Sequence, residues 1–190
     1  MEHATSGEQF DQCRQIYDAL RRPQQNRREH LPLSLQQKRH TSLSEDVCMN
    51  LLREVGGINC GVDSGPGVRR YLAIGMDKSA RSPCILASPT TDECQLKSTL
   101  KQYPFDYETG PNELAIERIA HYLQLSQKES TVNSLRRLVK SLASLFCDKR
   151  ATFLSTSIVE RLGEVKVVNA HFSLDKDNDS FLIHDGQESH

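Results

Sequence analysis

A cluster of glycines is the feature that most constrains how this chain can fold: six of its ten glycines lie between residues 56 and 75. Glycine is favoured where a backbone turns sharply or lies close to another group, so this segment must contain tight turns or a binding site. Two nucleotide-binding motifs do not fit it. A P-loop needs a lysine directly after its second glycine, and no lysine follows these glycines before Lys78. A dinucleotide fingerprint needs a strand before it and a helix after it, which reverses the order predicted here.

The residues on either side of the glycines predict a helix followed by a β-hairpin. Ser42 and Glu45 have the spacing of a capping box, and Gly56 follows the last apolar residue of that helix. We expect five apolar residues of the helix to face inward: Val47, Cys48, Leu51, Leu52 and Val55. Residues 58–62 and 68–76 then predict two strands joined by a five-residue loop.

The rest of the chain predicts more helix than strand. In chain order we expect a strand at 84–88, a helix at 91–102, a helix beginning at 110–111, a helix at 131–148, a shorter helix at 150–162 and a terminal hairpin of residues 165–174 and 180–185. The predicted fold class is α+β. It is one compact domain in which antiparallel β-hairpins, at about 58–76 and 165–185, pack on several amphipathic helices.

The N-terminal residues predict a separate region. Residues 8–21 carry five apolar side chains at helical spacing: Phe10, Cys13, Ile16, Tyr17 and Leu20. Residues 22–40 are rich in glutamine and arginine and hold few residues that could form a core, so we expect a flexible basic arm. The predicted division is residues 1–40 for the helix and arm and residues 41–190 for the α+β domain.

Composition and cysteine spacing exclude several classes of protein. No apolar run approaches the roughly 18 residues that cross a bilayer, and the acidic first thirty residues are unlike a secretory signal. The six cysteines include no C-x2-C or C-x4-C pair of the kind typical of zinc sites. We therefore expect reduced thiols, no metal or other cofactor, no membrane association, and a cytoplasmic or nuclear location.

Helix 131–148 carries the clearest apolar stripe in the sequence. Five residues that recur at three- and four-residue spacing are candidate interaction residues: Leu135, Leu138, Leu142, Leu145 and Phe146. The same stripe fits a core helix packed on its own sheet, which we favour. Self-association through the stripe stays open as the alternative.

Two groups of basic residues are candidates for binding anions or nucleic acid. The first group lies in the arm and consists of Arg21, Arg22, Arg27, Arg28, Lys38 and Arg39. The second group consists of Arg69 and Arg70 after the glycine loop and of Arg136, Arg137 and Lys140 on the face of helix 131–148 opposite its leucines. Phosphate contacts by such residues would give binding that depends on salt and not on base sequence. The overall net charge of −1 is no signature of nucleic-acid binding.

No combination of residues predicts catalysis, since Ser64 in the glycine loop has no evident partner base. We therefore expect a non-enzymatic protein–protein interaction protein, either an adaptor or a subunit of a larger complex, with a homodimer as one version. Two alternatives stay open. One is nucleic-acid binding through the arm at 21–39 and the basic face of helix 131–148; the other is a small hydrolase or transferase acting at the turn 61–67.

Overall fold

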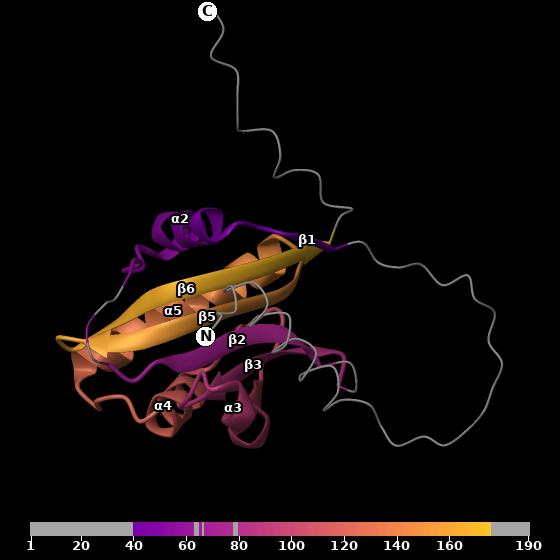
Figure 1. Cartoon of the computed structure of the whole chain (residues 1–190). Coiled ribbons are helices and arrows are strands. Elements are labelled where there is room, and N and C mark those ends of the chain that lie inside the picture. The colour runs from indigo at the N-terminus through magenta and orange to yellow at the C-terminus, as the bar shows by residue number, and fades with distance from the viewer. Residues whose placement is uncertain (1–39, 63–64, 66, 78–79, 176–190) are drawn as a thin grey trace, which may run out of the picture.

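The computed structural model describes residues 40–62, 65, 67–77 and 80–175. This part of the chain forms four helices and one six-stranded antiparallel sheet with the strand order β1-β6-β5-β2-β3-β4 (Figure 1). The predicted α+β class, with antiparallel hairpins packed on amphipathic helices, is confirmed. The predictions for the helix at 8–21, the strand at 180–185 and the arm up to residue 39 fall outside the described residues. His40, the last residue assigned to the arm, is instead part of the sheet, where it pairs with Asp175.

The elements have the following bounds. The strands are β1 (His40–Ser42), β2 (Arg70–Asp77), β3 (Ser82–Ser88), β4 (Lys101–Pro104), β5 (Ala151–Arg161) and β6 (Glu164–Asp175). The helices are α2 (Glu45–Gly56), α3 (Glu93–Thr99), α4 (Glu113–Tyr122) and α5 (Glu129–Asp148). None of these helices is long and apolar enough to span a bilayer.

One face of the sheet carries the main core. Helices α2, α4 and α5 pack there against alternating side chains of the central strands, among them Leu72, Ile85 and Phe172. Helix α5 supplies the largest share, because its apolar stripe faces the sheet along several turns. The candidate interaction residues all lie in this core and are buried: Leu135, Leu138, Leu142, Leu145 and Phe146. The stripe is therefore that of a core helix and offers no exposed surface to a partner.

The opposite face of the sheet carries a smaller cluster. Tyr71, Ala73 and Leu86 of the central strands pack there with Phe153 of β5. Among the described helices, α3 packs on this face through Leu96. The sheet is thus buried on both faces, which explains why its central strands lack a clean alternation of apolar and polar residues.

The largest error of the sequence prediction concerns residues 150–162, which were expected to form a helix and instead form strand β5. The segment is rich in β-branched residues, and it pairs with β2 on one side and with β6 on the other. Its side chains are buried on both faces, with Phe153 and Ser155 on one and Leu154 and Ile158 on the other. A strand with one buried face shows alternating apolar and polar residues. In β5 this alternation is not visible in the sequence, because polar residues such as Ser155 are buried as apolar residues would be.

Two further segments differ from the predictions. Residues 58–62 form no strand with β2; they contribute a single parallel bridge between Cys60 and Val167 of β6. Strand β2 forms its hairpin with β3 instead. The predicted helix 91–102 ends at Thr99, because the chain then forms the edge strand β4.

Helix α2 ends at the predicted glycines, but the set of its residues that face the core differs from the prediction. Gly57 has a φ of 57°, the left-handed conformation that favours glycine after a helix. A Cβ atom on Gly56 would overlap the Oγ atom of Ser141, so a glycine is needed where α2 meets α5. The inward residues are Cys48, Met49 and Leu52, whereas Val47 and Val55, expected to face inward, are 40 % and 46 % exposed.

Candidate functional site

The segment before the glycine loop is fixed to the start of β6. The amide of Gly61 donates a hydrogen bond of 3.0 Å to the carbonyl of Val167, and the Val167 amide donates one of 2.9 Å to Asn59. The Nζ atom of Lys166 donates to the carbonyl of Val62 at 3.0 Å. The glycine region therefore lies beside the β5–β6 hairpin, at one end of the sheet (Figure 1).

The residues after the loop reach the same hairpin. A Cβ atom on Gly67 would lie 2.9 Å from a guanidinium nitrogen of Arg161, the last residue of β5. The backbone at Gly67 thus runs close to the β5–β6 hairpin, beside the end of strand β5. Both ends of the glycine loop are in this way positioned against one structural unit.

Three apolar side chains at this end of the sheet are exposed to solvent. Val62 is 90 % exposed, Val68 is 62 % exposed, and Leu162, in the turn of the hairpin, is 106 % exposed. We call these three residues the hairpin end. Single exposed apolar residues are common on proteins, and what the three share is that their segments belong to or lie against the same β5–β6 hairpin.

The turn that carries Leu162 has an unusual residue in it. Arg161 pairs with Glu164, so Leu162 and Gly163 form a two-residue hairpin turn, with φ values of 51° and 81°. Such turns need a positive φ at both positions and prefer Asn, Asp or Gly there. A leucine in this conformation costs roughly 1–2 kcal/mol, and its side chain gains nothing back from burial because it is fully exposed. The side chain at 162 therefore has no structural reason to be a leucine.

Arg70, a predicted anion-binding residue, has a structural role instead. It is buried, and it donates to the carbonyls of Leu123, of Gln124 at 3.0 Å and of Val68 at 3.1 Å. The contacts with Leu123 and Gln124 satisfy carbonyls just beyond the end of α4, where no further helical amide is available. Burial lowers the pKa of the Arg70 guanidinium, while the nearby Glu160 carboxylate opposes that shift.

Two of the groups considered for chemistry near the hairpin end are Cys60 and Ser64. Burial raises the pKa of the Cys60 thiol, against the opposing effects of Arg53 and Lys166, so the thiol stays protonated at neutral pH. No group of three or more His, Cys, Asp or Glu side chains in the described ranges could hold a metal ion. Ser64, the predicted nucleophile candidate, lies outside those ranges.

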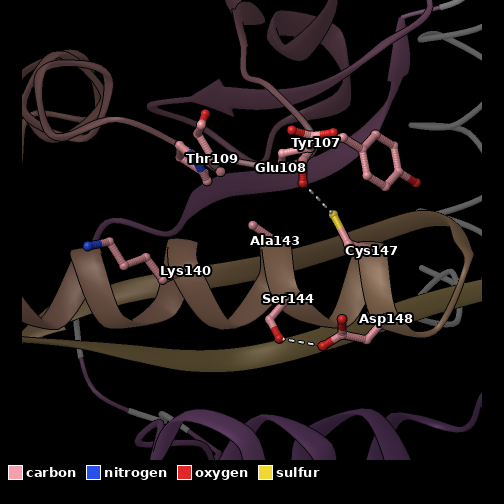
Figure 2. Close-up of a pocket in the computed structure, with 10 residues that line it drawn as sticks. Tyr107, Glu108, Thr109, Lys140, Ala143, Ser144, Cys147 and Asp148 are labelled. Atoms are coloured by element: carbon pink, nitrogen blue, oxygen red, sulfur yellow. Dashed lines mark hydrogen bonds between the residues drawn. The ribbon is translucent and has the colours of Figure 1, made fainter.

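A groove of about 410 Å³ lies elsewhere, between the turn at 106–111 and the C-terminal half of α5 (Figure 2). The Cys147 thiol points toward the Tyr107 carbonyl at 4.0 Å, and Ser144 donates to Asp148 at 2.7 Å. Burial, and secondly the charge of Asp148, raise the pKa of the Cys147 thiol. The groove therefore lacks an activated nucleophile, and most of its polar lining is exposed to water.

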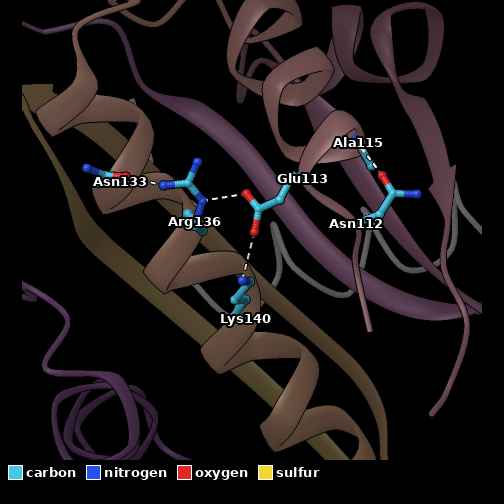
Figure 3. Close-up of polar contacts among 6 residues, drawn as sticks. All are labelled: Asn112, Glu113, Ala115, Asn133, Arg136 and Lys140. Atoms are coloured by element: carbon cyan, nitrogen blue, oxygen red, sulfur yellow. Dashed lines mark hydrogen bonds and ion pairs between the residues drawn. The ribbon is translucent and has the colours of Figure 1, made fainter. Parts of the chain in front are cut away.

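Two basic residues of α5 that were candidates for nucleic-acid binding are paired with an acid. The Glu113 carboxylate accepts from Lys140 at 2.8 Å and from Arg136 at 2.5 Å (Figure 3). The contacts with Lys140 and with Arg136 lower the pKa of Glu113. Arg136 also donates to Asn133 of its own helix. Arg137 is exposed, as is Arg69 near the hairpin end.

The basic residues predicted to bind anions are therefore not gathered in one place. Arg69 lies by the hairpin end, Arg70 is buried behind α4, and the α5 residues line a different surface. The six basic residues of the arm lie outside the described residues. Nucleic-acid binding stays a prediction, with no described cluster of basic residues to carry it.

Comparison with known proteins gives no further indication of function. No protein-family model matches the chain, and no curated protein matches it in sequence.

Sequence reasoning missed Leu162, although a signal for it was present. A residue followed by Gly163, between two segments rich in β-branched residues, is typical of a two-residue hairpin turn. The expectation of a helix at 150–162 concealed that pattern. If β5 had been recognised as a strand, Leu162 would have stood out as an apolar residue in a turn that prefers Asn, Asp or Gly.

Proposed function

We propose that the chain is a non-enzymatic protein–protein interaction protein, an adaptor or a subunit of a complex, which contacts its partner through the hairpin end. The observation that carries the proposal is Leu162, a fully exposed leucine held in a left-handed turn conformation that disfavours it. Strained, exposed residues of this kind are concentrated at functional sites. Val62 and Val68, which are also exposed, lie on segments that contact the same hairpin.

The surroundings of Leu162 fit a protein partner better than a small molecule. Val62, Val68 and Leu162 are each more than half exposed, whereas a small-molecule site buries most of its ligand between its walls. Exposed Arg69 and Glu164 supply a charged margin around the apolar side chains. An apolar centre with a polar margin is the usual anatomy of a protein interface.

The experiment compares the full-length chain with Leu162→Asn, which suits the turn and removes the apolar side chain. Each is immobilised, and the proteins captured from a lysate of the source cells are quantified by mass spectrometry. Light scattering of the purified chains measures self-association in parallel. Leu114→Asn is the matched control, because Leu114 is also exposed but lies at the start of α4.

We expect Leu162→Asn to reduce a specifically captured partner, or the self-association, at least tenfold, because the central residues of an interface carry most of its binding energy. Leu114→Asn should leave both unchanged. A strictly monomeric chain that captures nothing would refute the proposal. So would a partner that binds the Leu162→Asn chain as well as the original.

A further inference from the structure

Two positively charged side chains hold the segment that precedes the glycine loop, and both bind neutral oxygen atoms. The Nζ atom of Lys166 donates to the Val62 carbonyl at 3.0 Å. Arg53, near the end of α2, donates to the Cys60 carbonyl at 3.1 Å and to the Asn50 side chain at 2.6 Å. Neither cation is paired with a carboxylate of the described residues. Because a neutral carbonyl does not cancel a charge, the surface around Val62 is positive.

Arg69 adds a third positive charge on the other side of the loop. It directly follows Val68, it is exposed, and its side chain makes no hydrogen bond or ion pair with the part of the chain that the structure describes. The register pairs its neighbour Arg70 with Ile158, so the residues before Arg70 run along the end of β5. That end leads into the turn with Leu162, so Arg69 lies at the same end of the sheet as Leu162.

The acidic residues of the same segments compensate only part of this positive charge. Glu160 is partly buried, and its carboxylate accepts from a backbone amide at 2.9 Å and from a threonine hydroxyl at 3.2 Å. Glu54 and Glu164 are the exposed acids. The Cys60 thiol reports the balance: burial raises its pKa, and the two charges that oppose this shift, those of Arg53 and Lys166, are both positive.

The combination of exposed apolar and positive groups limits the chemistry of a partner. In a symmetric dimer, a second copy of the chain would place the same positive patch against itself. An anionic membrane entered by Leu162 would repel the Glu164 carboxylate two residues away. Single-stranded nucleic acid binds by stacking its bases on aromatic rings, whereas the exposed apolar side chains of the hairpin end are aliphatic.

We propose that the hairpin end binds an acidic segment of a protein partner in which carboxylates flank apolar side chains. The apolar side chains cover the hairpin end, and the carboxylates lie against Arg53, Arg69 and Lys166. A guanidinium that has no other partner can bind a carboxylate through two parallel hydrogen bonds, so Arg69 contributes most. This inference rests on the proposed function and adds to it the chemistry of the partner.

The experiment measures the binding of labelled synthetic peptides to the full-length chain by fluorescence anisotropy. In one peptide each leucine is flanked by glutamates, and in the second peptide glutamine replaces every glutamate. Arg69→Glu is compared with Arg137→Glu, because Arg137 is also an exposed arginine but lies on α5. Vesicles of phosphatidylserine and phosphatidylcholine, and single-stranded poly(U) RNA, are the probes for the other classes of anionic partner.

We expect the glutamate peptide to bind at least tenfold more tightly than the glutamine peptide at low ionic strength, and added salt to reduce the difference. Arg69→Glu should weaken binding of the glutamate peptide at least tenfold, and Arg137→Glu should leave it unchanged. Equal binding of the two peptides, or equal effects of the two variants, would overturn the proposal. So would vesicle or RNA binding that Arg69→Glu abolishes in a chain that does not bind the glutamate peptide.

The same measurements separate this proposal from the proposed function. If Leu162→Asn reduces capture or self-association but Arg69→Glu does not weaken binding of the glutamate peptide, the hairpin end binds a partner of different chemistry. The inference then fails and the proposed function stands. If Leu162→Asn changes neither capture, self-association nor peptide binding, both fail, whatever the effect of Arg69→Glu.

Discussion

Helix α5 and the hairpin end each carry a set of apolar residues, and the two sets differ in their exposure to solvent. The leucines of α5 have the regular spacing of an interaction stripe, yet they are buried in the core against the sheet. Leu162 and the two valines near it have no regular spacing, yet they are exposed. The comparison teaches that periodicity identifies residues that face a core. We propose that a surface for a partner is marked instead by an apolar residue in a place where its own fold gives it no support.

The largest effect that would test this comparison is on stability. Replacing Leu142 by alanine removes a completely buried side chain of α5 and should lower the free energy of unfolding by about 3 kcal/mol. The matched change Leu162→Ala should have almost no effect, because that side chain buries nothing. Chemical denaturation of both variants measures the difference. Similar losses of stability in the two would contradict the contrast between the clusters.

Arg70 provides a second test of what is structural near the glycine loop. Arg70→Met keeps the length of the side chain but leaves the carbonyls of Leu123 and Gln124 without their donor. We expect the free energy of unfolding to fall by about 1–3 kcal/mol, the cost of leaving the buried Leu123 carbonyl unsatisfied. Arg69→Met, at the exposed neighbouring position, is the control and should be neutral. If the two variants were equally stable, Arg70 would not have the capping role described.

A smaller effect of opposite sign is expected at the hairpin turn. Leu162→Asn should raise the free energy of unfolding by about 0.5–1 kcal/mol, because asparagine tolerates the left-handed conformation better than leucine does. Thermal denaturation would detect this gain. The account predicts that the same variant is more stable and binds its partner less well. A loss of stability would show that Leu162 supports the fold.

The smallest expected effect concerns Glu113, whose side chain is 53 % exposed and pairs with two basic residues. Because its pKa in the folded chain lies below the ordinary value of 4.5, the stabilisation by its carboxylate is present above that value and is lost as the pH falls through the folded pKa. Glu113→Gln should lower the denaturation midpoint slightly at neutral pH and not at all at strongly acidic pH. Glu117→Gln, which removes a carboxylate from an exposed position of the same helix, is the matched control for the loss of one negative charge. A pH-independent difference for Glu113→Gln would contradict the ion pairs.

The sequence predicted the helices better than the strands, for identifiable reasons. Helices α2, α4 and α5 have apolar residues on one side and recognisable ends, such as Gly57 after α2. Strand β5 was mistaken for a helix because both of its faces are buried, so Thr156 and Ser155 interrupt the pattern without being exposed. Residues 58–62 were given the wrong partner, since the bonds that hold them come from Val167, more than a hundred residues later.

The candidate site followed the same division. That the glycine segment contains tight turns could be predicted, because glycines mark turns. The exposure of Leu162 was missed because residues 150–162 were expected to be a helix, and a residue followed by Gly163 indicates a hairpin turn only when both flanking segments are strands. Likewise, Arg69 and Arg70 look equivalent in sequence. Only the position of the end of α4 makes one of them a buried structural residue.

The most direct test of the central claim is amide hydrogen exchange of the chain alone and in complex with its captured partner, or at concentrations where it self-associates. The account predicts slower exchange on binding at residues 58–62, at 67–69 and around the turn at 161–164, with the groove beside Cys147 unchanged. Protection confined to that groove, or to any surface away from the hairpin end, would contradict it.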